Sequence, residues 1–169
     1  MGGDLALLGA ALVFGIGSAL LPMFLNAELY VVSMGALVSE SILAIVIVSL
    51  VVGTVIGKAF VFELARKGTS RIRNVERQPS QRRLVVWMRS VADRLHLRQV
   101  SDWLLALLDR RYVGALTVFV SSLVGVPPLA VVTLVAGASS QPRWLFLLMV
   151  FIGRLLQFLA IGYLVHAAF

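Results

Sequence analysis

Two hydrophobic stretches of this 169-residue chain are each interrupted by proline and then resume as a short apolar segment. The first is broken at Pro22 and the second at Pro127-Pro128, and each resumed segment ends in a Gly-Ala pair, at 35–36 and 137–138. In lipid such a break is costly, because the freed backbone groups have no water to bond, so it needs cover from protein or from an aqueous cavity. Paired breaks in two halves of a chain are typical of transport sites between inverted repeats. The pattern therefore predicts a small membrane transporter.

Composition supports a membrane protein. Hydrophobic residues make up 60% of the chain and the mean hydropathy is +0.97, against roughly 45–50% apolar residues in soluble domains. This is enough for about four membrane elements, so we expect residues 1–169 to form a single membrane domain in a bacterial or archaeal plasma membrane. The absence of cysteine excludes disulfides, thiol chemistry and cysteine-bound metals.

The first half predicts a hairpin followed by a long helix. Residues 5–21 are apolar, and the chain returns over 29–38, whose ten residues would rise only about 15 Å as a helix. Because a hydrocarbon core is about 30 Å thick, we expect a re-entrant hairpin with its tip at 22–28. After a polar turn, residues 42–65 form one long apolar helix, which completes a repeat over about 5–66.

The second half, about 112–169, shows the same order. Residues 112–125 enter the bilayer, the tip at Gly125 to Pro128 breaks the segment, and 129–138 return as a short arm. The last long helix is 144–168. The fold class expected is thus an all-α integral membrane protein, an inverted repeat of re-entrant hairpin plus long transmembrane helix.

Positive charge gathers between the two halves. Residues 66–99 carry ten Lys and Arg side chains against two acidic ones. The positive-inside rule therefore places 66–111 in the cytoplasm. Within it, 82–99 has one apolar stripe, typical of a basic amphipathic helix on anionic lipid headgroups. We expect no nucleic-acid partner, because the block lacks interleaved aromatic residues. The basic residues assigned to the membrane surface are Arg66, Arg82, Arg83, Arg89, Arg94 and Arg98.

Small residues mark the expected helix contacts. The long helix of the first half contains a small-xxx-small face, which lets helix backbones approach closely in a membrane. The glycines assigned to packing are Gly35, Gly53, Gly57, Gly137 and Gly153.

Three charged residues lie in or beside apolar segments that we expect to be in the membrane, where burying a charge costs free energy. Glu28 follows Asn26 at the first break, and Lys58 and Arg154 lie inside the two long helices. A charge at the centre of a membrane helix costs about 2.5–3.5 kcal/mol, so each needs a reason. One reading is a substrate site, with the two cations holding a phosphate, Glu28 carrying a proton and Asn26 beside it. The other is structural: Lys58 snorkels to the interface, Arg154 bonds a buried carbonyl and Glu28 is their counter-ion.

No pattern favours an enzyme. Metal-binding HExxH spacing, a nucleophile elbow, a phosphate loop and a dinucleotide fingerprint are all missing from the sequence. We therefore expect neither a cofactor nor a metal.

These motifs resemble the DedA family, also called the VTT or SNARE-associated superfamily. That family has a Pro-Gly-acid hairpin tip followed by Gly-Asp-x-x-Gly-Tyr-x-x-Gly-Arg-x-x-Gly. Glu28 matches the acid, and Arg66 and Gly68 match the last Arg and Gly. The second half, from Pro128 to Gly153-Arg154, is similar to the family's Pro…Ala-Gly…Phe…Ile-Gly pattern.

The chain departs from the family pattern at charged positions. Lys58 stands where the family has Asp, and Phe62 replaces Tyr. The arginine expected before the second tip is replaced by Ser121-Ser122-Leu123. A proton-coupled carboxylate and arginine set would therefore have to be re-sited, with Arg154 supplying positive charge.

The resemblance implies translocation of a lipid or lipid-linked phosphate, such as a polyprenyl phosphate or a phospholipid. The partners expected are membrane lipids, with a homodimer as the oligomer to test. Two alternatives stay open: proton-coupled export of a small cation or drug, and a non-transporting scaffold that recruits partners through its basic helix.

Overall fold

The computed structural model describes residues 2–21, 25–75, 106–108 and 110–168, and within them all regular structure is helical. The expected amphipathic helix 82–99 and Pro22 lie outside these residues. The helices labelled within the described residues are α1 (Gly2–Leu20), α2 (Ala27–Leu37), α3 (Glu40–Val75), α6 (Arg111–Val124), α7 (Leu129–Ala138) and α8 (Arg143–Ala168). In the part of the chain that the structure describes, two stretches are long and apolar enough to cross a membrane, Glu40–Gly68 and Arg143–Ala168.

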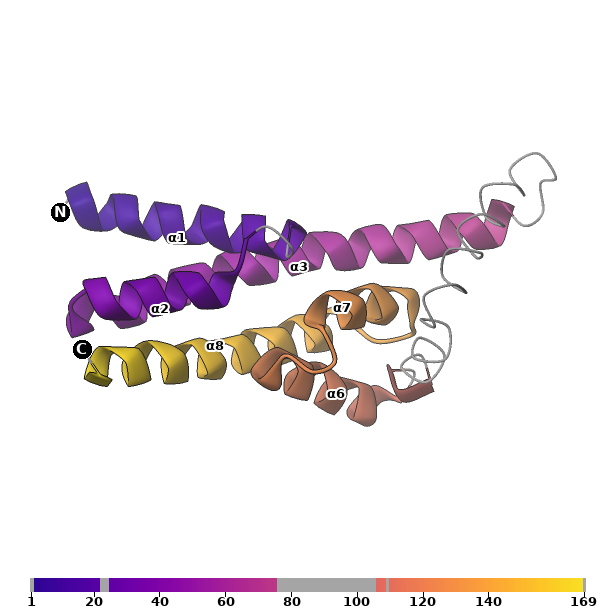
Figure 1. The fold of residues 1–169 in the computed structure, drawn as a ribbon. Coiled ribbons are helices and arrows are strands. Elements are labelled where there is room, and N and C mark those ends of the chain that lie inside the picture. The colour runs from indigo at the N-terminus through magenta and orange to yellow at the C-terminus, as the bar shows by residue number, and fades with distance from the viewer. Residues whose placement is uncertain (1, 22–24, 76–105, 109, 169) are drawn as a thin grey trace.

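Two helical hairpins enter the molecule from opposite ends. In Figure 1, α1 and α2 form a hairpin whose turn lies near the middle, and α6 and α7 form another whose turn points back toward it. The long helices α3 and α8 then run past these turns in opposite directions. Their 11 and 10 residues make α2 and α7 too short to span a bilayer. The all-α fold and its opposed halves are as the sequence predicts.

Each long helix completes the core of the other half. Phe62 of α3 is fully buried among residues of α6, α7 and α8, where its ring stacks on Phe146 with centroids 4.8 Å apart. Correspondingly, in the other core, Phe158 of α8 is buried among residues of α1, α2 and α3. The two halves therefore cannot pack their hydrophobic cores independently.

The glycines of the two Gly-Ala pairs allow close contact between each short returning helix and a long helix. A Cβ on Gly35 would come within 2.8 Å of the Gly162 carbonyl oxygen of α8, and one on Gly137 within 2.5 Å of the Phe62 carbonyl oxygen of α3. Each returning arm thus packs its glycine against the long helix of the opposite half. Gly153 likewise leaves room for the Ser122 side chain of α6.

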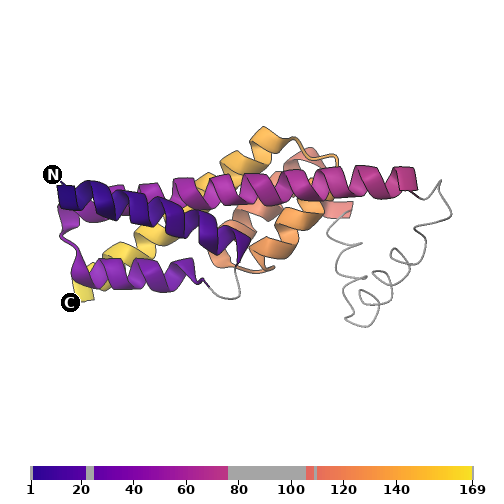
Figure 2. The ribbon, with the colours of Figure 1, turned by 90° about the horizontal axis from the view of Figure 1, so that it is seen from above.

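Small residues also bring α1 onto α3, which lie side by side in Figures 1 and 2. A Cβ on Gly53 would overlap the backbone of Leu12, and one on Gly57 would lie 2.5 Å from the Ala19 Cβ. This is the close contact expected of the small-xxx-small face.

Local hydrogen bonds form at both breaks, at the end of α6 and at the start of α2. At the second, Gly125 takes a left-handed φ of 83°, which glycine adopts without a Cβ clash. The Ser121 hydroxyl then donates to the Pro127 carbonyl at 2.6 Å. At the first, the Asn26 side chain caps α2 by accepting from the Glu28 amide at 2.9 Å.

Helix α3 is longer than predicted. It continues to Val75, whereas the sequence pattern predicted that the long apolar helix ends at residue 65. Loss of apolar periodicity marks the end of a buried face and not the end of a helix, since Arg and Lys have good helix propensity. Basic residues near a helix C-terminus also interact well with the helix dipole.

Candidate functional site

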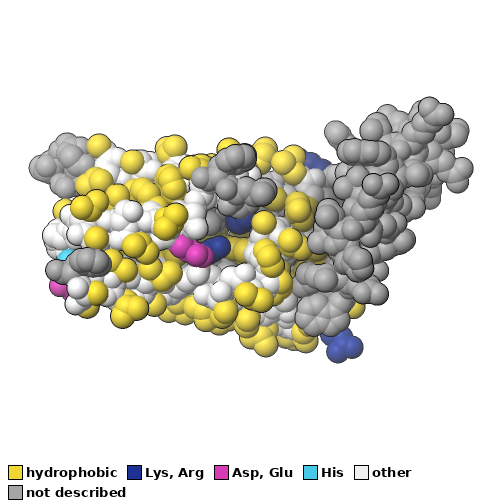
Figure 3. Space-filling view, in the orientation of Figure 1, with side chains coloured by type: hydrophobic (Ala, Val, Ile, Leu, Met, Phe, Trp, Pro, Cys, Tyr) yellow, Lys and Arg dark blue, Asp and Glu magenta, His cyan; other side chains and the backbone are white. Residues whose placement is uncertain are grey.

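A cavity of about 240 Å³ lies between the two hairpin turns. Leu25 to Glu28 of the first turn and Pro128 to Ala130 of the second both line it. Helices α1, α3 and α8 supply the remaining wall, with Ser18, Ala19, Thr54, Lys58 and Arg154. In Figure 3, acidic and basic side chains meet in a hollow midway along a face that is otherwise largely hydrophobic. The breaks therefore border a polar cavity, as their cost in lipid requires.

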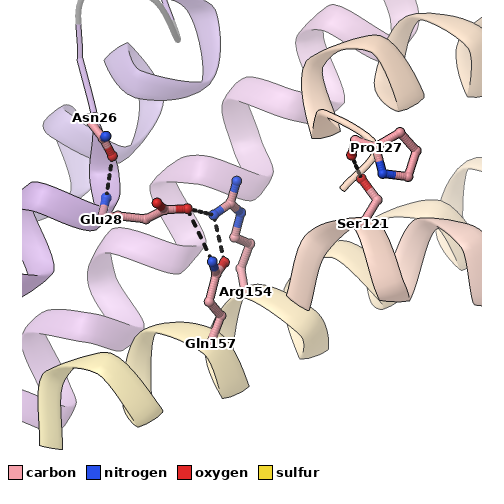
Figure 4. Close-up of polar contacts among 6 residues, drawn as sticks. All are labelled: Asn26, Glu28, Ser121, Pro127, Arg154 and Gln157. Atoms are coloured by element: carbon pink, nitrogen blue, oxygen red, sulfur yellow. Dashed lines mark hydrogen bonds and ion pairs between the residues drawn. The ribbon is translucent and has the colours of Figure 1, made fainter. Parts of the chain in front are cut away.

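Glu28 forms a three-residue cluster with α8. Its Oε1 lies 3.3 Å from Nη1 of Arg154 and accepts a second hydrogen bond, at 3.1 Å, from Nε2 of Gln157. The same Arg154 nitrogen donates to Oε1 of Gln157 at 2.7 Å. Figure 4 shows Glu28 reaching from the start of α2 to both partners. The cluster joins the first hairpin to the long helix of the second half.

Exposure differs sharply across this ion pair. The Arg154 side chain is 15% exposed and that of Glu28 is 45% exposed. The Nε atom of Arg154 is buried without a hydrogen-bond partner, and the guanidinium carbon lies 5.3 Å from the centre of the Phe158 ring. Arg154 therefore retains an unused donor, and its carboxylate partner sits on the open side.

Lys58 is the second buried cation. The residue is 4% exposed, and its Nζ donates a long bond of 3.4 Å to the carbonyl oxygen of Ala19, near the end of α1. The structural interpretation of the sequence predicted that Lys58 snorkels to an interface and that Arg154 bonds a buried carbonyl. In the structure, it is Lys58 that bonds a carbonyl, and it does not reach an interface.

The charges that line the cavity do not balance. Lys58 and Arg154 face one carboxylate, Glu28, so the described lining carries one net positive charge. Buried cations with unused donors are suited to binding an anion, and a planar guanidinium can grip two oxygens of a phosphate at once.

The structure thus gathers Asn26, Glu28, Lys58, Arg154 and Pro128 around one cavity. Gly125 and Pro127 lie in the second turn beside it. Five of the basic residues assigned to the membrane surface, Arg82, Arg83, Arg89, Arg94 and Arg98, lie outside the described residues.

Arg66 has a different environment from that predicted. Its Nη2 donates to the Gln141 carbonyl at 2.6 Å, and its guanidinium lies 4.7 Å from the Phe62 ring centre. It therefore ties α3 to the turn between α7 and α8, rather than lying only on a membrane surface.

Sequence reasoning missed Gln157. Residues three apart on a helix share a face, so a glutamine three positions after a buried arginine was a signal that the pair acts together. No group of three His, Cys, Asp or Glu residues able to hold a metal occurs among the described residues.

Comparison with known proteins gives one family. The model of the VTT domain matches residues 21–167, a range that includes both turns and the whole Glu28–Arg154–Gln157 cluster. No curated protein and no solved structure gives a significant match.

Proposed function

Because the chain belongs to the VTT-domain family and is therefore a membrane protein of the DedA type, we propose that it translocates a lipid or a lipid-linked phosphate across the bilayer. The observation that carries the proposal is the cavity between the two turns, with two buried cations against one half-exposed carboxylate. A polyprenyl phosphate or a phospholipid would place its phosphate there. The two hairpins would be re-entrant and would meet within the bilayer.

The placement of the cavity favours a lipid over a water-soluble substrate. The long axes of α3 and α8 run across Figure 1, and crossing helices would align these axes with the membrane normal. The charged hollow of Figure 3 then opens sideways, toward lipid, and not at either end. A lipid could thus insert its headgroup while its tails stay in the hydrocarbon. Net positive charge also disfavours export of a small cation, because like charges repel.

In this proposal the phosphate replaces Glu28 as the partner of Arg154. The guanidinium already carries a buried nitrogen without a partner, so it gains hydrogen bonds on binding. The released carboxylate lies on the open side of the cavity, where it can take up a proton. Exchange of these two partners would couple headgroup entry to proton movement.

A liposome assay with fluorescent phospholipid tests this function. The purified chain should speed the movement of a headgroup-labelled lipid between leaflets, read out by quenching with a membrane-impermeant reductant. Glu28→Gln should abolish movement, because Gln keeps size and hydrogen bonding but cannot ionise. Arg154→Gln should weaken it, because an amide cannot reproduce the guanidinium fork.

The matched control is Glu40→Gln, which makes the same chemical change at the exposed start of α3 and should leave movement unchanged. Size-exclusion profiles and thermal denaturation show whether each variant is folded. Loss of folded protein in both site variants, with no separable transport defect, would favour a structural ion pair. Full movement in both would place the site elsewhere, and none in the unmodified chain would favour the scaffold.

A further inference from the structure

A second cavity, of about 570 Å³, lies between α3 and α8, apart from the two hairpin turns. Its wall is mostly apolar and includes Ile56, Phe60 and Leu64 of α3 with Leu147 of α8. Phe60 and Leu64 are 58% and 54% exposed. This is a hydrophobic groove on a stretch of α3 that is long and apolar enough to cross a membrane.

Charged side chains close one end of the groove. Glu63 and Lys67, one turn apart on α3, and Arg143, the first residue of α8, all line it. Nη1 of Arg143 pairs with Oε1 of Glu63 at 3.1 Å, while the Arg143 side chain stays 51% exposed. The described lining residues at this end are thus two cations and one carboxylate.

The length of the groove matches one leaflet. Its α3 wall runs from Val55 to Lys67, a rise of about 18 Å at 1.5 Å per residue. Half of a hydrocarbon core is about 15 Å. A phospholipid could therefore lay one acyl chain along the apolar wall with its phosphate at Arg143.

We propose that this groove binds an anionic phospholipid, with Arg143 at the phosphate and Phe60 and Leu64 along an acyl chain. The charged end is the one from which the basic segment 66–111 departs, and anionic lipids are enriched in the leaflet that basic segments face. A second copy of the chain fits less well, because two grooves would bring like-charged ends together.

Native mass spectrometry of the purified full chain tests the proposal. With phosphatidylglycerol and phosphatidylcholine added in equal amounts, the protein should retain phosphatidylglycerol. Arg143→Gln should lower that retention by roughly tenfold, the loss expected for a charge-assisted hydrogen bond. Ala59→Trp, which fills the groove, should lower retention of both lipids. Leu164→Trp, at a 75% exposed position near the end of α8, is its control and should retain both.

The decisive comparison uses the two partners of the ion pair. Glu63→Gln frees Arg143 and should keep or raise phosphatidylglycerol retention. If it lowers retention as Arg143→Gln does, the ion pair is only structural and the proposal is wrong. Equal retention of both lipids, or none, also overturns it, as does thermal stabilisation by glycerol 3-phosphate alone equal to that by the lipid. Because retention is measured without transport, the result does not depend on the function proposed above.

Discussion

The substitution Lys58→Met separates a functional charge from a structural one. It keeps an unbranched side chain of similar length and removes a cation from a residue that is only 4% exposed. A buried charge kept for binding should cost the fold stability, whereas a charge kept for structure should add to it. The sign of the stability change therefore distinguishes the two roles.

The expected size of the effect follows from the contacts of Lys58. A lysine at the centre of a membrane helix costs about 2.5–3.5 kcal/mol. Its hydrogen bond to the Ala19 carbonyl is long, at 3.4 Å, and such a bond contributes about 0.5–1.5 kcal/mol. Lys58→Met removes the burial cost and loses the hydrogen bond, so the variant should be more stable by the difference, about 1–3 kcal/mol. For a chain of this size that raises the melting temperature by roughly 2–12 °C.

Thermal denaturation in detergent, followed by intrinsic fluorescence, measures the shift, and the liposome assay measures lipid movement. We expect Lys58→Met to melt higher and to move phospholipid more slowly. The control Val48→Met changes a 41% exposed position of the same helix and should shift stability by less than about 0.5 kcal/mol. A lower melting temperature with unchanged lipid movement would refute a binding role for Lys58.

Three further predictions concern packing and topology. Gly53→Leu should lower stability by about 1–3 kcal/mol in thermal denaturation, because its side chain would overlap the backbone of Leu12 and force α1 away from α3. Arg66→Gln should lower it by about 1.5–3 kcal/mol, because the charged hydrogen bond from α3 to the turn between α7 and α8 is lost. Ser80→Cys, in a chain without other cysteines, should resist an impermeant maleimide in intact cells. Labelling there would reverse the predicted orientation.

The helix breaks were the part of the fold that the sequence predicted most accurately. The second hairpin was predicted as 112–125 and 129–138, and the structure has α6 over Arg111–Val124 and α7 over Leu129–Ala138. Agreement is close because Gly and Pro act through the local backbone, which neighbouring sequence alone specifies. The end of α3 was harder to predict, because a helix can extend past its apolar face without any local signal that ends it.

Glu28, Lys58 and Arg154 were recognisable as candidates because charge in an apolar segment needs a reason wherever the segment lies. The structural interpretation also gave Glu28 as the counter-ion of Arg154, and the structure contains that ion pair. The contact of Glu28 with Gln157 and that of Lys58 with the Ala19 carbonyl were not predicted. Glu28 and Gln157 are 129 residues apart in the sequence. Lys58 bonds to α1, whereas the two interpretations of the sequence gave it a phosphate, or an interface with Glu28 as counter-ion. Partner choice depends on how the two halves dock.

The sequence by itself determined where helices break, which stretches suit lipid and which charges are out of place. These properties follow from the residue and its near neighbours. Only the tertiary structure decided that both turns border one cavity and that Phe62 and Phe158 each pack into the core of the opposite half. It also decided that the described lining of this cavity carries one net positive charge. Those features arise from contacts between segments distant in the chain, where burial and shape, and not local pattern, select the partner.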